Sequence, residues 1–453
     1  MDGDARIKSP KDINFMDPEV QKDWFSAYEV LHRDAPVYFM PELGMYVITK
    51  YEDIRDIVRQ PEKFTVGPDV QETEPLLKFP EARALYEQKG WLRYTALGEN
   101  VPKHRNYRDM VDPYLTPVAV RVREPYIRAL VNELIDGWID TGEVEFLKAF
   151  AEPLPMMVIA DFLGFPRMDL PNLKRWSAAW VAPFARGLTL EDEIKAVSEH
   201  IELQHYIYET MQEKRKNPKD DLITKLVNAE YFDVELGKTR PLTDVEIIGI
   251  TDHLLIGGNE TTAFALSNGL WLLFRQPEIY KQIDADHSKI KTFVEEVLRV
   301  ESPTQGLYRF VTEDVEIRGV KIPKGSTLSM RYGAANRDPD QYPCPHMVDL
   351  GRGNAGSHMA FSQGEHHCPG ASLSRFEQYC AWDILLNRLK NIRPAEEKND
   401  YDHLPGIWLR ALKEIHKRFD KAVYAQDREE PTHEGHHRHL ALPVAGPLLQ
   451  FVP

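Results

Sequence analysis

The sequence Phe361-Ser362-Gln363-Gly364-Glu365-His366-His367-Cys368-Pro369-Gly370 places two glycines, two histidines and a cysteine in one short stretch. An apolar pattern typical of a helix follows directly. Pro369 suits the first turn of that helix, since the N–H that proline lacks would have no partner there. Cys368 is therefore expected just before a helix N-terminus, where free N–H groups and the helix dipole stabilise a thiolate.

The two glycines of this loop, Gly364 and Gly370, allow the backbone to pass close to a bulky group. A thiolate held under a flat metal macrocycle fits this arrangement, because cysteine is one of the axial ligands of protein-bound haem iron. A buried structural cysteine in a glycine-rich turn is the alternative. A zinc site made by His366, His367 and Cys368 is a weaker one, because adjacent ligands do not easily complete a tetrahedron.

The whole pattern, Phe-x-x-Gly-x-His-x-Cys-x-Gly, resembles the cysteine-ligand loop of the cytochrome P-450 family. Ser362 stands at a position where glycine is also common in that loop. The resemblance covers residues 15–420 and implies that Cys368 is the axial ligand of the iron in haem b. It also implies that Phe361, His366 and Gly370 belong to the cofactor site.

The same resemblance implies a mainly α fold with small β-sheets, a triangular helical prism with a long central helix over the haem. The apolar periodicity of the chain agrees with a mainly helical protein. The local patterns predict helices over 21–33, 51–59, 118–140, 154–164, 192–214 and 243–275, a hairpin over 37–49, strands over 307–311, 315–317 and 327–330, and a weakly patterned stretch over 61–100.

The chain has 453 residues, which would allow about three average domains. We expect instead one cytochrome P-450 domain over residues 1–425, because the motifs from His104 to Cys368 all meet at one cofactor. Residues 426–453 are expected to form a His-rich C-terminal tail. The histidines there allow metal binding, but a mobile tail is the simpler interpretation; they are His433, His436, His437 and His439.

The composition limits the compartment and the partners. Three cysteines without an evident disulfide framework indicate a reducing compartment. The N-terminus has no apolar signal core, and no run of about 18 apolar residues predicts a membrane span. A net charge of −15 argues against nucleic acid as a partner. We therefore expect a cytoplasmic, monomeric protein.

The second strong pattern is the long predicted helix 243–275, which begins with the capping box Thr243-Asp244-Val245-Glu246. Two glycines in its middle, Gly257 and Gly258, cost roughly 1 kcal/mol each. An accidental break or a groove for a ligand are the two interpretations. The segment Gly-Gly-x-Glu-Thr resembles the oxygen-binding part of the family's central helix. The resemblance implies that Thr261, which shares a face with Gly257, and Glu260 are catalytic.

Several basic side chains of this sequence stand at positions where the resembled family binds the haem propionates. His104 and Arg108 are four residues apart and share a helical face, which also fits an ordinary surface pair. The resemblance implies that both bind propionates, as do Arg309 and His358, with help from His366. Glu296 and Arg299 form an i,i+3 pair that is usually a solvated bridge. Their place between central helix and cysteine loop resembles the family's buried structural pair.

The residues that line the substrate pocket are less clearly marked. His253 and Ile256 precede Gly257 on the central helix and are expected to border the pocket, although His253 also fits a satisfied core histidine. The resemblance places a lid at 176–187 and a returning turn near 406–409. The expected pocket residues are His253, Ile256, Gly257, Trp180, Phe184, Thr304, Leu307, Ile407 and Trp408.

Together these features predict a haem-thiolate monooxygenase that uses O2 to hydroxylate a hydrophobic small molecule. Electrons are expected from NAD(P)H through a [2Fe-2S] ferredoxin and a ferredoxin reductase, since the chain shows neither G-x-G-x-x-G after a strand nor enough cysteines for a cluster. A haem-thiolate peroxygenase or isomerase and a non-catalytic haem sensor or carrier are the alternatives. The pair Glu260-Thr261 argues against the first of them.

Overall fold

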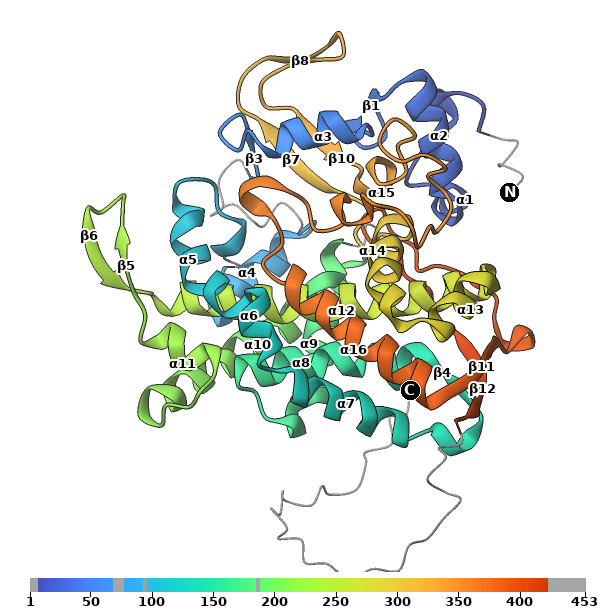
Figure 1. Ribbon diagram of the computed structural model, residues 1–453. Coiled ribbons are helices and arrows are strands. Elements are labelled where there is room, and N and C mark those ends of the chain that lie inside the picture. Colours follow the sequence, from blue (N-terminus) through green and yellow to red (C-terminus); the bar gives the residue numbers. More distant parts are fainter. Residues whose placement is uncertain (1–6, 68–76, 93, 95, 185–187, 423–453) are drawn as a thin grey trace, which may run out of the picture. The chain divides into compact units, whose positions relative to one another are not determined.

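The computed structural model describes residues 7–67, 77–92, 94, 96–184 and 188–422. This part of the chain is mainly helical and carries small sheets, which confirms the predicted fold class (Figure 1). The long helix α12, Asp244–Arg275, runs through the middle of the fold, and α16, Ala371–Arg388, lies against it. The described residues up to Lys421 form one compact unit. The predicted His-rich tail lies outside the described residues.

Two sets of elements complete the described fold. The helices are α1 Pro18–Lys22, α2 Trp24–Asp34, α3 Tyr51–Val58, α4 Pro80–Lys89, α5 Lys103–Leu115, α6 Pro117–Arg121, α7 Glu124–Asp136, α8 Pro153–Leu163, α9 Leu170–Val181, α10 Leu190–Lys216, α11 Leu222–Val227, α13 Pro277–Ala285, α14 Ile290–Val300 and α15 Tyr332–Ala335. The strands are β1 Val37–Met40, β2 Met45–Ile48, β3 Phe64–Thr65, β4 Glu143–Glu145, β5 Glu230–Asp233, β6 Lys238–Pro241, β7 Leu307–Val311, β8 Val315–Ile317, β9 Val320–Ile322, β10 Thr327–Met330, β11 Leu389–Pro394 and β12 His416–Lys421.

A five-stranded sheet has the order β1-β2-β10-β7-β3. Strand β10 pairs parallel to β2 and antiparallel to β7, with Leu328 opposite Arg309. The predicted hairpin and the predicted strands over 307–311, 315–317 and 327–330 are confirmed. Strand β7 matters for the site because it carries Leu307 and Arg309.

Helix α12 begins as its sequence predicts: Thr243 accepts a hydrogen bond from the N–H of Glu246, and the Glu246 carboxylate accepts one from the N–H of Thr243. Its two central glycines have different surroundings. A Cβ on Gly258 would lie 2.9 Å from Cγ1 of Ile159 on α8, whereas a Cβ on Gly257 would meet only Cδ2 of His253, 4.0 Å away. Gly258 thus allows close packing of α8 on α12, and Gly257 leaves open space beside the helix.

Helix α14 anchors the long segment that leads to the cysteine loop. Its Glu296 and Arg299 side chains are both fully buried, and Arg299 Nε donates to Glu296 at 2.6 Å. The Arg299 guanidinium also donates to three main-chain carbonyls of that segment, those of Asn336, Pro345 and Met347. The pair therefore lies in the interior, where its hydrogen bonds fix a stretch of chain without regular structure.

Three predicted helices have other boundaries in the structure. The predicted helix 21–33 is divided into α1 and α2 because Asp23 caps a new helix at Trp24. The predicted helix 118–140 is α6 and α7, and Pro125 lies in the first turn of the second. The helix after the cysteine begins at Ala371 with Gly370 as its N-cap, so Pro369 lies just outside it.

The weakly patterned stretch 61–100 contains strand β3 and helix α4. Contacts distant in sequence hold α4 on α10: Glu193 accepts hydrogen bonds from the N–H groups of Lys78 and Phe79, and the Tyr86 hydroxyl lies 2.6 Å from Nδ1 of His200. The local pattern carries little information about such contacts. None of the described helices has the length and apolar character needed to cross a membrane.

Candidate active site

The loop from Phe361 to Gly370 forms a tight turn below α12. The N–H of Cys368 donates to the carbonyl of Phe361 at 2.9 Å and closes the turn. Gly364 has a φ of +72°, and a Cβ there would lie 2.4 Å from the carbonyl oxygen of Val58, so only glycine fits. Ser362 also adopts a positive φ, 56°, and its hydroxyl accepts a hydrogen bond from Tyr332 at 3.0 Å.

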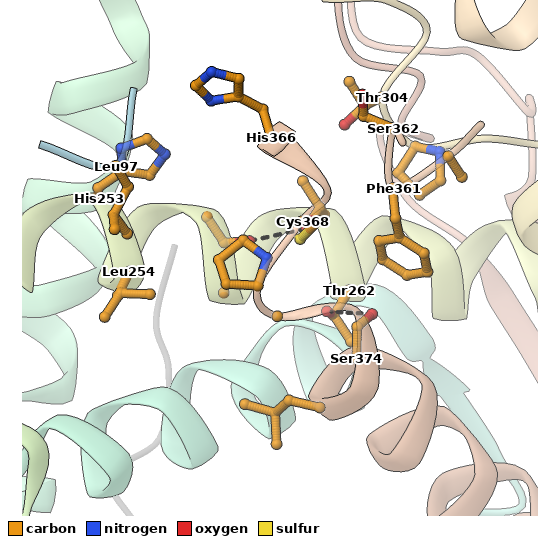
Figure 2. A pocket seen from close by; sticks show the side chains of 18 of the residues that line it. Leu97, His253, Leu254, Thr262, Thr304, Phe361, Ser362, His366, Cys368 and Ser374 are labelled. Atoms are coloured by element: carbon orange, nitrogen blue, oxygen red, sulfur yellow. Dashed lines mark hydrogen bonds between the residues drawn. The ribbon is translucent and has the colours of Figure 1, made fainter. Parts of the chain in front are cut away.

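The sulfur of Cys368 faces a cavity between this loop and α12 (Figure 2). Burial raises the pKa of the thiol, and the N–H groups of Gly370 and Ala371 oppose the rise. The helix N-terminus therefore favours the anion as predicted, but it does not outweigh burial by itself. A positive ion next to the sulfur would stabilise the thiolate in this position.

The opposite wall of the cavity is the face of α12 that carries Gly257, Gly258, Thr261 and Thr262. The Thr261 hydroxyl donates to the carbonyl of Gly257 at 3.0 Å, while the Thr262 hydroxyl donates to Ser374 Oγ on α16 at 2.9 Å. Apart from Arg108, Arg309, His366 and Glu377, the remaining described lining is mostly apolar and comprises Val66, Leu97, Gly98, Leu115, Ile159, His253, Leu254, Leu298, Pro303, Thr304, Leu307, Tyr332, Ala360, Phe361, Ser362, Pro369, Gly370 and Leu373.

One edge of the cavity carries cations without a full set of partners. Arg309 is 3% exposed, and among the described residues its guanidinium donates one hydrogen bond, to the carbonyl of Tyr308. Burial lowers the pKa of Arg309, because no carboxylate of the described chain compensates its charge. Arg108 lines the same edge but is better partnered: its Nε pairs with Asp112 at 2.7 Å, and its Nη1 donates to the carbonyls of Glu365 and His367. A buried cation of this kind is stable only with an anion beside it.

Two imidazoles lie near the same edge. The rings of His104 and His366 contact each other at a tilt of 33°, with centroids 3.9 Å apart. Both ring nitrogens of His104 are enclosed and have no hydrogen-bond partner in the described structure, although Glu365 Oε1 lies 3.6 Å from Nδ1. Burial lowers the pKa of His104 to about 4, so the ring is neutral at pH 7. A flat dianionic metal macrocycle fits this edge, the sulfur and the apolar walls together.

A family model described as "Cytochrome P450" matches residues 156–418, more than half of the chain. The chain belongs to the cytochrome P450 family. It is 32% identical over 410 residues to the biotin biosynthesis cytochrome P450 of Bacillus subtilis, which covers 89% of this chain and 98% of that one. It is 30% identical over 334 residues to the cytochrome P450 monooxygenase PikC of Streptomyces venezuelae, covering 73% and 77% of the two chains.

Solved P450 structures resemble this one closely. P450BioI in complex with acyl carrier protein carrying hexadec-9Z-enoic acid has a TM-score of 0.79 at 29% identity and covers 89% of this chain and 100% of that one. CYP109E1 of Bacillus megaterium in complex with testosterone has a TM-score of 0.76 at 30% identity and covers 89% and 99%. The chain is thus a cytochrome P450 monooxygenase, and its family implies a haem.

His358 does not line the cavity of this P450, although it was predicted to contact a propionate. Its Nε2 lies 3.1 Å from Glu295 Oε2, and its Nδ1 accepts a hydrogen bond from the N–H of Ala360. Glu295 also accepts hydrogen bonds from Arg375 and Tyr379. Both nitrogens of His358 are therefore engaged in a cluster that joins α14 to α16.

Of the predicted pocket residues, four line the cavity: His253, Gly257, Thr304 and Leu307. Four others are not part of its wall. Ile256 is buried in the main core, and Ile407 packs in the cluster around α2. Trp408 stacks edge-on against Tyr308 with centroids 3.8 Å apart, and Trp180 donates from Nε1 to Asp252 at 3.0 Å. The Phe184 side chain lies outside the described structure.

Glu260 lies behind Thr261 on α12 and does not line the cavity. Burial and the nearby Glu152 carboxylate raise the pKa of Glu260 to about 7, and Lys174 opposes this rise. Glu152 and Lys174 form an ion pair in which Lys174 is half exposed. A carboxyl group with a pKa near neutral thus lies on α12 next to Thr261 and close to a surface ion pair.

One carboxyl of the cavity was not predicted. Glu377 on α16 is buried, its Oε2 has no hydrogen-bond partner among the described residues, and burial raises its pKa well above the usual range. The sequence carried a signal for it, because Glu377 interrupts the apolar stripe formed by Leu373, Cys380 and Ile384. A charged residue within such a stripe is rarely without a function or a partner.

Proposed function

We propose that the protein binds haem b through Cys368 and hydroxylates a hydrophobic small molecule with one atom of O2. The observation that carries this proposal is the opposition of two features across one cavity: the cysteine sulfur on one side, and the open face of Gly257 and Thr261 on the other. In this assignment Arg309 and Arg108 neutralise the haem propionates, with His366 as a neutral donor beside them. His104, which was predicted to bind a propionate, does not line the cavity and packs against His366 with both ring nitrogens enclosed. His358 supports this edge indirectly through Glu295 and Arg375.

A bound haem supplies the oxidising chemistry, and the thiolate favours cleavage of the O–O bond. The residues of the chain orient the reactants and supply protons. Thr261 holds its hydroxyl against the Gly257 carbonyl, where it can pass a proton into the cavity. Glu260 supplies that proton from the side of Glu152 and Lys174. The apolar wall excludes bulk water from the reacting atoms.

The electrons are proposed to come from NAD(P)H through a [2Fe-2S] ferredoxin and a ferredoxin reductase in the cytoplasm. The substrate class is supported by the apolar lining and by the relatives, one of which was solved with testosterone and another with a fatty acyl chain on its carrier protein. The chain is proposed to act as a monomer of one P450 domain, residues 1–425.

The direct test is substrate-dependent oxidation of NADH. The purified holoenzyme is combined with a ferredoxin and its reductase, and ligands are first screened for the spin-state shift of the haem band. We expect NADH consumption to increase with at least one such ligand and mass spectrometry to find a product heavier by one oxygen atom. Product formation that proceeds with hydrogen peroxide but not with O2 and NADH would assign the protein to the peroxygenases.

Replacement of Thr261 with alanine is expected to leave ligand binding intact and to lower the yield of product per NADH at least about tenfold, with hydrogen peroxide released instead. The reason is the loss of the hydroxyl that faces the open space at Gly257. The matched control is Thr262→Ala, because its hydroxyl bonds to Ser374. Equal product yield in the two variants would remove Thr261 from proton delivery.

Glu260 makes catalysis depend on pH. Its pKa of about 7 means that the carboxyl carries a proton in acid and loses it as the pH rises, so proton delivery should weaken from about pH 6 to about pH 8. Glu260→Gln is expected to lower the product yield and to remove this pH dependence. Glu152→Gln removes a charge that raises the pKa, so the profile should move toward lower pH. A profile unchanged in Glu260→Gln would contradict the assignment.

A further inference from the structure

His253 is the one ionisable side chain that the described first half of α12 contributes to the cavity wall. It lies one helical turn before Gly257, and its Cδ2 is the atom closest to the open space beside that glycine. Leu97 and Leu254 line the cavity next to it, and Figure 2 shows all three at the same end of the pocket. An imidazole has thus been placed in an apolar end of the cavity.

The imidazole has no partner within the described protein. Its Nδ1 is enclosed and makes no hydrogen bond. Its Nε2 also makes none of the described hydrogen bonds, and it is absent from the enclosed, unpartnered atoms, so it is open to the cavity. Asp252, the neighbouring acid, turns its Oδ2 to His200 and Trp180 on the other side of α12. The interpretation as a satisfied core histidine is therefore not supported.

The chemistry of a neutral imidazole then determines which nitrogen carries the proton. Burial lowers the pKa of His253, so the ring is uncharged at neutral pH and has one N–H and one lone pair. An enclosed N–H without an acceptor costs more than an enclosed lone pair without a donor, since orphaned N–H groups are the rarer of the two in proteins. The proton consequently belongs on Nε2, which directs a hydrogen-bond donor into the cavity.

We propose that His253 determines substrate specificity by donating from Nε2 to a carbonyl or carboxylate oxygen on an otherwise apolar substrate. The proposal rests on the proposed monooxygenase function, in which the substrate occupies this cavity. Four residues of helix correspond to about 6 Å, so the acceptor lies about one helical turn from the carbon that is oxidised beside Gly257. A substrate without the oxygen would leave the donor desolvated and unpaired.

The test compares ligands that differ only in the oxygen. The probes are 4-phenyl-2-butanone against butylbenzene, and decanoic acid against decane, and calorimetry on the holoenzyme measures their binding. Wild type is expected to prefer the oxygen-bearing member of at least one pair by about tenfold or more. His253→Leu should abolish the preference, and His253→Gln should retain part of it because glutamine keeps a donor. Leu97→Ala, which changes the same wall without a donor, should weaken both members of a pair alike.

The outcomes separate the possible sources of a preference. A preference for the ketone alone identifies a carbonyl acceptor, and one for the acid alone identifies a carboxylate. If the preference persists in His253→Leu, the donor is Arg108 and the proposal is overturned. The proposal is also overturned if wild type binds both members of each pair equally, or binds neither. If the leucine variant does not fold, His253→Phe is used, since it keeps a ring and has no donor. The CO spectrum of each reduced protein tests haem–thiolate ligation separately, so a failure of the proposed function is recognised independently.

Discussion

Cys368→Ser is expected to abolish the red-shifted Soret band of the reduced, CO-bound protein and to reduce monooxygenase turnover below detection. Serine has no sulfur, and its hydroxyl remains protonated in a site that raises even the pKa of a thiol. It therefore cannot replace the anionic thiolate as a ligand. The fold should survive, because the turn is closed by main-chain bonds such as the one from the Cys368 N–H to the Phe361 carbonyl. Circular dichroism measures the helix content, and the CO spectrum measures the ligation.

The two other cysteines provide the controls. Cys344 is exposed, and Cys380 is buried on α16, where burial raises the pKa of its thiol to about 12. Both serine variants should keep the thiolate band at the wild-type position. If Cys368→Ser keeps that band, the axial ligand is another residue and the assignment of the loop is wrong.

Arg299→Ala is expected to lower the free energy of unfolding by about 3 kcal/mol, since it removes the bidentate partner of the buried Glu296 carboxylate and leaves only Arg352 and the N–H of Asp349 beside it. It also removes the donors to the carbonyls of Asn336, Pro345 and Met347, so the segment before the cysteine loop loses its anchor. Urea unfolding measures the stability. Haem content after purification measures the loss of the anchor.

The exposed pair Glu278 and Lys281 on α13 is the matched control, because it has the same i,i+3 spacing with both side chains in solvent. Lys281→Ala should cost less than about 1 kcal/mol. Equal losses for Arg299→Ala and Lys281→Ala would show that burial of the pair contributes nothing.

The parts of the fold that could be predicted are those whose physical cause is local. The capping box at Thr243 and the positive φ of Gly364 are each set within a few residues, so their sequence pattern determines their structure. The strands over 307–311 and 327–330 also follow from their apolar pattern. Helix α4 was missed because side chains of α10, more than 100 residues later, hold it in place.

In the candidate site too, some residues could be predicted from the sequence and others could not. Cys368, Thr261 and Arg309 lie at the cavity because the order of the motifs fixes where their elements meet. The environment of His358 could not be predicted, since it depends on Glu295, whose role is visible only once α14 and α16 are packed. Trp408 likewise faces Tyr308 instead of the pocket, because a contact distant in sequence places it: its carbonyl accepts a hydrogen bond from the N–H of Gln305.

The two adjacent glycines of α12, Gly257 and Gly258, differ in whether they tolerate a larger side chain. A methyl group at Gly258 would collide with Ile159 and disturb the packing of α8 on α12, whereas one at Gly257 would enter only the cavity. Alanine is also favoured over glycine within a helix by about 1 kcal/mol, so Gly257→Ala is expected to gain stability. Substitutions at position 257 can therefore change which molecules the cavity accepts without loss of folding. A single amino-acid change at this position is enough to alter the substrate range of the enzyme.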